Sequence, residues 1–439
     1  MKDNLFYRFR STTALLGEKK ELENQEIYFA SIDELNDPME GKPDLVFKGD
    51  RIVWENLFKH YLSHFYGLVM FVPEKLKQEY QLTWRDIPFE EDVPSILKYG
   101  YRDDFINIKN TFLDKCRGII NKLAIRKRPI AQIELQALLS RIHCIMIECF
   151  AQHRPQLKTN ISSMDFIKSI EKGLELADNL RDRDLLDFSF NLLNSISIRN
   201  AIVTNNVLRN DFVEAYNQSL YHLVYPMHYV ACFSENANNP TMWGHYADSH
   251  KGVCLIFKAN NNQIKLTEKD LFNNSIYDQD YKFESVKYTK RRIKFNFFEE
   301  ISMLPLPRLM SIWCQSENRE VSRFFNKIYK KWESNQAEKW RDRKNTHLIK
   351  TKHWKYEKEY RLVKHFVFGS RAKKEECIVN YRFQDLEGII FGIKTSMADK
   401  IKIFNIIKEK CQKEKRTDFK FYQAYFCHKT QQILYFPIV

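Results

Sequence analysis

The sequence has few of the residues that interrupt or reverse regular secondary structure. Its 439 residues include only 12 glycines and 12 prolines, which together make under half of the usual share of roughly 12%. Tight hairpins depend on such residues, so an all-β fold with many short turns is disfavoured. A collagen-like or low-complexity chain is excluded by the same composition. Because 44% of the residues are hydrophobic and 14% are aromatic, most of the chain can form a packed core.

Long hydrophobic runs and paired cysteines are also missing. No apolar run reaches the ~18 residues that a membrane-spanning helix needs. Residues 1–5 lead into strand-like sequence without the hydrophobic region of a signal peptide. The nine cysteines contain no C-x-x-C pair, which disfavours a secreted disulfide scaffold. We therefore expect a cytoplasmic protein that has no membrane partner.

Several common catalytic motifs do not occur. The sequence has no G-x-G-x-x-G, G-x-x-x-x-G-K-[ST], H-E-x-x-H or G-x-S-x-G, so dinucleotide-fold dehydrogenases, P-loop enzymes and α/β-hydrolases lose their main support. Four potential metal ligands lie close together in an apolar run, but their spacing does not place them all on one helical face. We therefore expect no metal site. The four residues are His143, Cys144, Cys149 and His153.

The charge balance of the chain favours one class of partner. The chain carries 70 lysines and arginines against 56 aspartates and glutamates, a net charge of +14, which favours a polyanionic partner. In Lys330–Lys355, basic residues alternate with tryptophans. Such a segment can bind a nucleic-acid strand by charge and stacking, or it can form a solvated helix that buries its tryptophans on the other face.

The order of strand-like and helix-like segments predicts an α+β fold with a mostly antiparallel central sheet. Residues 1–49 are expected to form the N-terminal part of this core, and residues 50–225 a large all-helical insertion. Residues 226–439 then supply the main part of the core, with a second helical insertion at about 299–345. Strands are expected at residues 6–10, 27–30, 229–234, 252–257, 285–288, 360–368, 386–391, 419–426 and 433–438.

The first strand and the turn after the second supply candidate polar residues. Arg8 and Arg10 alternate with aromatic residues, so both point to the same side of the strand. An arginine that faces a cleft binds phosphate or carboxylate through two parallel hydrogen bonds; a surface strand of alternating charge would look the same. Asn36 and Asp37 stand in a turn where their side chains can bond to the local backbone.

Residues 241–252 concentrate aromatic and histidine side chains beside a buried strand. His245 and His250 titrate near neutral pH, and Trp243 and Tyr246 can stack on a ligand ring. In the alternative interpretation Trp243 and Tyr246, three residues apart on a short helix, anchor the core, and the histidines only form hydrogen bonds.

A third candidate group lies late in the chain. If the strand begins early enough, Glu357, Glu359 and Arg361 share one of its faces. Two carboxylates ~7 Å apart on one strand can divide the work, one orienting a hydroxyl and the other activating a nucleophile. The alternative is a solvated strand face with an ordinary Glu–Arg pair.

Three motifs in this order resemble a bacterial domain-of-unknown-function family, number 2971. They are Tyr7–Arg10 followed by Phe29–Glu40, then Met242–Cys254, then Trp354–Arg361. The resemblance covers roughly residues 1–45 and 226–395, so the helical block between them looks like an insertion. It implies a cytosolic bacterial protein of the kind found among mobile or defence genes.

The layout is also similar to the ADP-ribosyltransferase fold, whose enzymes cleave NAD. The resemblance implies an arginine on the first strand (Arg8 or Arg10), a serine on a middle strand (Ser234) and a catalytic Glu359 beside Glu357. Glu359 would hold the ribose, Glu357 would direct the acceptor, and the arginine would bind the phosphates of NAD, the substrate. Trp243 or Tyr246 would stack on nicotinamide, and the remaining candidates for substrate binding are His245, His250, Asn36, Asp37 and Arg361.

Two functions follow from these observations. The first is transfer of ADP-ribose from NAD to protein, nucleic acid or water, in a toxin-like or phage-defence effector. The second is a non-catalytic module that binds nucleic acid or protein through its basic helical surface.

Overall fold

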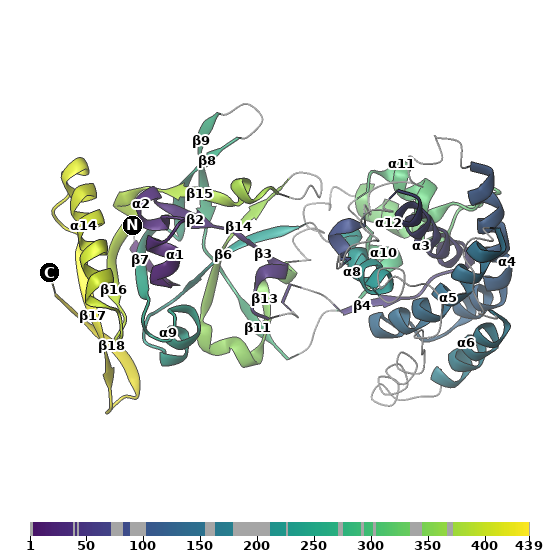
Figure 1. Cartoon of the computed structure of the whole chain (residues 1–439), viewed down its shortest axis with the longest axis horizontal. Coiled ribbons are helices and arrows are strands. Elements are labelled where there is room, and N and C mark those ends of the chain that lie inside the picture. Colours follow the sequence, from purple (N-terminus) through teal and green to yellow (C-terminus); the bar gives the residue numbers. More distant parts are fainter. Residues whose placement is uncertain are drawn as a thin grey trace. The chain divides into compact units, whose positions relative to one another are not determined.

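The computed structural model describes two compact units, each formed by several segments of the chain (Figure 1). The sheet unit comprises residues 1–42, 227–291 and 345–439, and the helical unit comprises residues 43–226 and 292–344. Both helices and strands are abundant, so the predicted α+β class is confirmed. The described residues are 3–37, 40–41, 44–71, 82–87, 102–153, 163–178, 211–224, 227–270, 275–290, 294–301, 304–333, 345–366 and 372–438.

In the helical unit, both insertions contribute to one hydrophobic core. Trp54 contacts Phe298 with ring centroids 5.1 Å apart, and Phe297 contacts Trp313 at 5.2 Å. The first insertion supplies α3 (Arg51–Phe71), η3 (Trp84–Asp86), α4 (Arg102–Ile125), α5 (Gln132–His153), α6 (Ser163–Ala177) and α8 (Asp211–Val224). The second supplies α10 (Phe297–Glu300), α11 (Leu306–Leu309), the π-helix η7 (Met310–Cys314) and α12 (Arg323–Glu333).

This unit is not entirely helical, which differs from the expectation for residues 50–225. Three short strands, β4 (Asp44–Phe47), β5 (Ile130–Ala131) and β12 (Lys294–Asn296), form a small sheet in the order β12-β4-β5. Phe47, on β4, buries its ring against Phe297 at 5.1 Å. β4 therefore belongs to the helical unit, although the sequence placed residues 1–49 in the sheet core.

The sheet unit is built on one large sheet whose main strands lie in the order β10-β14-β6-β1-β7-β16-β17-β18. Neighbouring strands are antiparallel except β16 and β17, which are parallel. The predicted mostly antiparallel sheet is therefore confirmed. The bounds are β1 (Asp3–Arg10), β6 (His228–Ser234), β7 (Val253–Asn260), β10 (Glu284–Ser285), β14 (Glu359–His365), β16 (Leu386–Phe391), β17 (Lys420–Cys427) and β18 (Gln432–Pro437).

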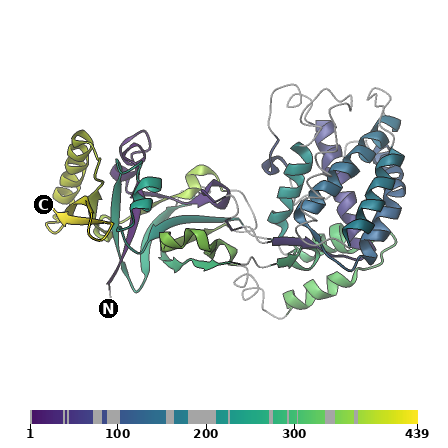
Figure 2. The ribbon, with the colours of Figure 1, turned by 90° about the horizontal axis from the view of Figure 1, so that it is seen from below.

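Helices cover both faces of this sheet because alternate residues of its strands are apolar on either side. On one face α14 (Met397–Glu414) places Phe404 against Phe391 and Phe421, with ring centroids 5.5 and 4.2 Å apart. Figure 2 shows α14 beside the C-terminal strands. On the other face α9 (Pro240–Tyr246) packs Trp243 edge-on against Phe9.

Three strands of the large sheet were missed in the sequence. β8 (Gln263–Lys269) and β9 (Ile276–Lys282) form the hairpin labelled in Figure 1, and β15 (Ile378–Tyr381) pairs with β8 and β2. Asn261 and Asn262, between β7 and β8, both have positive φ angles (50° and 61°), as a type I′ turn requires. Here two asparagines replace the usual Asn-Gly signal.

The remaining elements of the sheet unit are short. The segment predicted as a strand at 285–288 is divided between β10 and β11 (Lys287–Thr289), and β11 pairs with β13 (Ile349–Thr351). The others are α1 (Thr12–Leu16), α2 (Glu21–Asn24), β2 (Glu26–Tyr28), β3 (Ala30–Ser31), and the 3₁₀ helices η1 (Ile32–Glu34), η8 (Thr346–Leu348), η9 (Lys352–Glu357), η11 (Lys374–Cys377) and η12 (Phe383–Asp385).

Among the described helices, none is long and apolar enough to cross a lipid bilayer.

Candidate functional site

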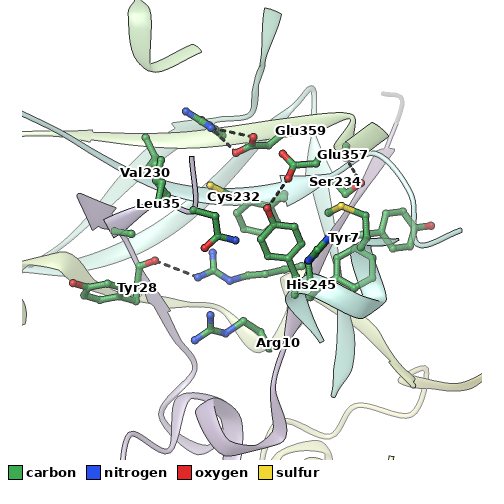
Figure 3. Close-up of a pocket in the computed structure, with 18 of the residues that line it drawn as sticks. Tyr7, Arg10, Tyr28, Leu35, Val230, Cys232, Ser234, His245, Glu357 and Glu359 are labelled. Atoms are coloured by element: carbon green, nitrogen blue, oxygen red, sulfur yellow. Dashed lines mark hydrogen bonds and ion pairs between the residues drawn. The ribbon is translucent and has the colours of Figure 1, made fainter. Parts of the chain in front are cut away.

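A cavity of about 590 Å³ lies in the sheet unit, within the range of roughly 300–1,000 Å³ that small-molecule sites occupy. It lies where one edge of β6 changes its partner. Ser234 pairs with Tyr7 of β1, whereas Val230 pairs with Ala30 of β3, so residues 231–233 lie between the two pairings. The cavity is lined by residues of β1, β6, β14, α9 and the segment around η1 (Figure 3).

Arg8 contributes a buried guanidinium to this cavity. Its side chain lies over the ring of Phe233 at 5.2 Å, and its Nη2 donates a hydrogen bond to the backbone oxygen of Tyr28 at 3.2 Å. Nη1 is buried and has no hydrogen-bond partner, and within the described residues no carboxylate forms an ion pair with Arg8. Burial, with a smaller effect of Arg10, lowers the pKa of Arg8 to about 10, so the group stays cationic at neutral pH.

Arg10 lines the same cavity but its charge is already compensated. Its Nε donates to Glu21 Oε2 at 2.9 Å, and Nη2 contacts the other oxygen of the same carboxylate. This two-pronged ion pair leaves Arg10 much less available to a ligand than Arg8. The structure thus distinguishes two arginines that the sequence could not.

Glu357 and Glu359 lie side by side in the cavity wall (Figure 3), but not on one strand as expected. Glu357 ends η9, Lys358 has a left-handed backbone (φ 46°), and Glu359 begins β14. The bend is held on both sides. Ser234 Oγ donates to the backbone oxygen of Glu357 at 2.7 Å, and the backbone N–H of Glu359 donates to Tyr288 Oη at 2.8 Å.

Two cations bind these carboxylates. Lys350 Nζ lies 2.6 Å from Glu357 Oε2 and 3.2 Å from Glu359 Oε2. Arg361 Nε and Nη2 donate to the two oxygens of Glu359 at 2.7 and 3.0 Å. Glu359 and Arg361 do share a face of β14, as the sequence predicted, and both are fully buried.

Glu40 completes the cluster from a distant part of the chain. Its carboxylate contacts Arg361 Nη2 and lies 3.3 Å from Lys350 Nζ. Sequence reasoning missed both Glu40 and Lys350, which lie in the cavity lining. The sequence did hold a signal for a second cation. Glu357 and Glu359 are two carboxylates, and Arg361 supplies only one positive charge beside them. We call Glu40, Lys350, Glu357, Glu359 and Arg361 the charge cluster.

The charge cluster holds three carboxyl groups and two cations, all with side chains at most 5% exposed. Burial raises the pKa of the Glu359 carboxyl to about 7, although Lys350 opposes the shift. Burial alone would lower the pKa of Lys350, but Glu359 and Glu357 outweigh it and raise that pKa. Burial lowers the pKa of Arg361 to about 9, and nearby Asp37 opposes that shift. The excess carboxyl group therefore favours one bound proton near neutral pH.

The aromatic segment at α9 divides between cavity and core. Tyr246 lines the cavity and donates from its hydroxyl to Glu357 Oε1 at 2.5 Å, and His245 lines it as an exposed side chain. Trp243 is fully buried, and its Nε1 donates to the backbone oxygen of Ala237 at 2.7 Å. Trp243 is thus a core anchor, as the alternative interpretation had it.

Of the other candidate residues, some line the cavity and some do not. Asn36 lines the cavity, as Tyr246 does. Asp37 is buried near Arg361 but does not line the cavity. His250 lies in a left-handed turn (φ 73°) outside the cavity lining, and burial lowers its pKa.

Three of the four potential metal ligands in α5, His143, Cys144 and Cys149, are buried, and the fourth, His153, is exposed. His143 Nδ1 bonds to Tyr61 Oη at 2.7 Å, and Cys149 is fully buried in the hydrophobic core. Among the residues that the structure describes, no three histidine, cysteine, aspartate or glutamate side chains are grouped to hold a metal ion.

No curated protein and no solved structure matches this chain. A family model does match, over residues 242–362, which contain α9, Lys350, Glu357, Glu359 and Arg361. Arg8, Glu40 and Ser234 lie outside the matched segment. The matching family is described as protein of unknown function, DUF2971, so the resemblance predicted from the motifs is confirmed over residues 242–362.

Proposed function

We propose that this protein cleaves NAD between nicotinamide and ribose and transfers the ADP-ribosyl group to an acceptor or to water. The observation that carries the proposal is that one cavity is lined both by the unpaired guanidinium of Arg8 and by the carboxyl groups of Glu357 and Glu359. A dinucleotide carries negative phosphates and, at its nicotinamide end, a positive ring. It therefore needs opposite charges within one cavity.

Arg8 is the phosphate-binding residue in this proposal. A buried guanidinium with an unbonded Nη1 gains a charge-assisted hydrogen bond when an anion enters. The cost of burying its charge has already been met during folding, so binding loses little to reorganisation. Arg10, which Glu21 neutralises, contributes mainly to the shape of the cavity.

The two carboxyl groups act on the ribose and the acceptor. The bond between the nicotinamide nitrogen and ribose C1′ breaks, the nitrogen keeps the electron pair, and neutral nicotinamide leaves. Positive charge then develops at C1′, and the Glu359 carboxylate stabilises it. Glu357 accepts the proton from the acceptor oxygen or nitrogen as that atom bonds to C1′. Tyr246, which holds Glu357 through its hydroxyl, also offers a ring face to nicotinamide.

This proposal includes a cellular role. An enzyme that consumes NAD, or that modifies a protein or nucleic acid, would act in the bacterial cytoplasm as a toxin-like or phage-defence effector.

The experiment is to incubate the purified full chain with NAD and to measure free nicotinamide, with and without protein and nucleic-acid acceptors. We expect release by the wild type, and about a 10²–10⁴-fold lower rate for Glu357→Gln and for Glu359→Gln. Arg8→Met should raise KM more than the matched Arg10→Met does. Failure of the wild type to release nicotinamide with any acceptor would contradict the proposal and favour a binding module. Salt-sensitive binding of nucleic acid would then identify its partner.

A further inference from the structure

Lys350 is surrounded by carboxylates and has no hydrogen left for a ligand. Its Nζ lies within 3.3 Å of oxygens of Glu357, Glu359 and Glu40. An ammonium group has three N–H donors, so three carboxylates satisfy it. Its side chain is 5% exposed, and Nζ lies 4.8 Å from the ring centre of Trp354.

The backbone around Lys350 is tied to the same carboxylates. Lys350 is the central residue of β13 and pairs with Tyr288 of β11. The hydroxyl of Tyr288 accepts the backbone N–H of Glu359. The strand pair that carries Lys350 therefore also fixes the start of β14.

We infer that Lys350 is the positioning residue of this site, which holds Glu357 and Glu359 side by side and keeps both able to ionise. Two adjacent carboxylates repel each other, and without a cation between them one takes up a proton. The groups that face this pair are Tyr246 from α9, Cys232 from β6, Tyr288 from β11, Arg361 from β14 and Glu40. Lys350 is the one cation that contacts both carboxylates among the described residues.

The inference predicts a shift in pH dependence, and it rests on the proposed function for that readout. In Lys350→Met the carboxyl groups should titrate at higher pH, so the acid limb of nicotinamide release should move up by about 1–3 pH units. Lys350→Arg keeps the charge and should restore the limb to within a few tenths of a unit. Glu40→Gln removes a negative charge and should move the limb to lower pH.

Lys364→Met provides the matched control. Lys364 is a buried lysine on β14 that pairs with Glu268, away from this cavity. Its replacement should lower stability without moving the pH profile. An unchanged limb in Lys350→Met and in Glu40→Gln would overturn the inference. If Lys350→Met does not fold, the direction of the Glu40→Gln shift decides.

A second readout separates this inference from the proposed function. Infrared absorption of protonated carboxyl groups, followed from pH 5 to 9, requires no substrate. Lys350→Met should keep a protonated carboxyl to higher pH than the wild type does, and Lys364→Met should not. Identical titrations in the three proteins would overturn the inference even if NAD is cleaved. A shifted titration would support it even if NAD is not the substrate.

Discussion

Each unit holds a prominent group of buried titratable side chains, and the two groups differ in charge. In the helical unit the group is neutral: His60 Nε2 bonds to His64 Nε2 at 3.0 Å, and His60 Nδ1 bonds to Tyr216 Oη at 2.8 Å. In the sheet unit the charge cluster buries three carboxyl groups with Lys350 and Arg361. Neutral partners satisfy each other at small cost, whereas buried ions must recover a large loss of hydration.

This difference indicates where function lies. A buried ion cluster can often be replaced by apolar residues without loss of stability, so stability alone does not explain the charge cluster. It also lines a cavity with Arg8, and perturbed titratable groups in a cavity are typical of functional sites. The His60–His64 pair packs against Trp313 in the hydrophobic core and is sufficiently explained by packing.

The largest expected effect comes from breaking the charge cluster. Arg361→Met would leave Glu40 and Glu359 without their shared guanidinium, while both carboxyl groups stay buried. We expect it to lower the free energy of unfolding of the sheet unit by about 3–5 kcal/mol. The control is Arg382→Met, which removes an exposed pair with Asp385 and should cost under about 1 kcal/mol. Denaturant unfolding measures the loss of unfolding free energy in both variants. Equal losses would contradict the expectation that the buried cluster matters more than the exposed pair.

Acidification should change the stability contributed by these two groups with opposite signs. In the helical unit the titrating residues are His60 and His64. Burial lowers the pKa of His64 to about 4 and that of His60 well below 6.5, with each ring kept neutral in the folded state. Below pH 6.5 the unfolded chain binds protons that the folded unit does not, so stability is lost as the pH falls. By pH 5 the loss from His64 alone is about 2 kcal/mol.

In the sheet unit burial raises the pKa of Glu359 to about 7, which reverses the sign of the change in stability with pH. Between pH 4.5 and 7 the folded state binds this proton more tightly than the unfolded chain does, so this group adds stability as the pH falls. Calorimetry at pH 7.5, 6 and 5 should show one transition moving down relative to the other, and Arg361→Met identifies the transition of the sheet unit. Two transitions that move together would contradict this prediction.

The extent to which the fold could be predicted follows from the pattern of each strand. β1, β6 and β7 carry apolar residues in clear runs or alternation, and the sequence located all three. β9 was missed because Tyr281 is its one buried residue, so no apolar alternation marks it. The turn before β8 was missed because Asn261 and Asn262 adopt positive φ without glycine.

The site was predictable where its residues share a motif. Arg8, Glu357 and Glu359 came from short local patterns and Ser234 from a resemblance in layout, and the structure places all four in the cavity lining. Glu40 meets Arg361 across 321 positions of sequence, and no local pattern records such a contact. Lys350 belonged to a basic run whose members look alike until the fold selects one of them.

The smallest expected effect comes from removing one buried hydroxyl in each unit. Tyr216→Phe removes the hydroxyl that bonds to His60 Nδ1, and Ser234→Ala removes the one that bonds to the backbone oxygen of Glu357. Each should cost about 1 kcal/mol of stability, because a single buried hydrogen bond is lost. Only Ser234→Ala loosens the bend that carries Glu357 and Glu359, so it alone should slow nicotinamide release. An equal fall in both variants would mean that release follows stability rather than the geometry of the cavity.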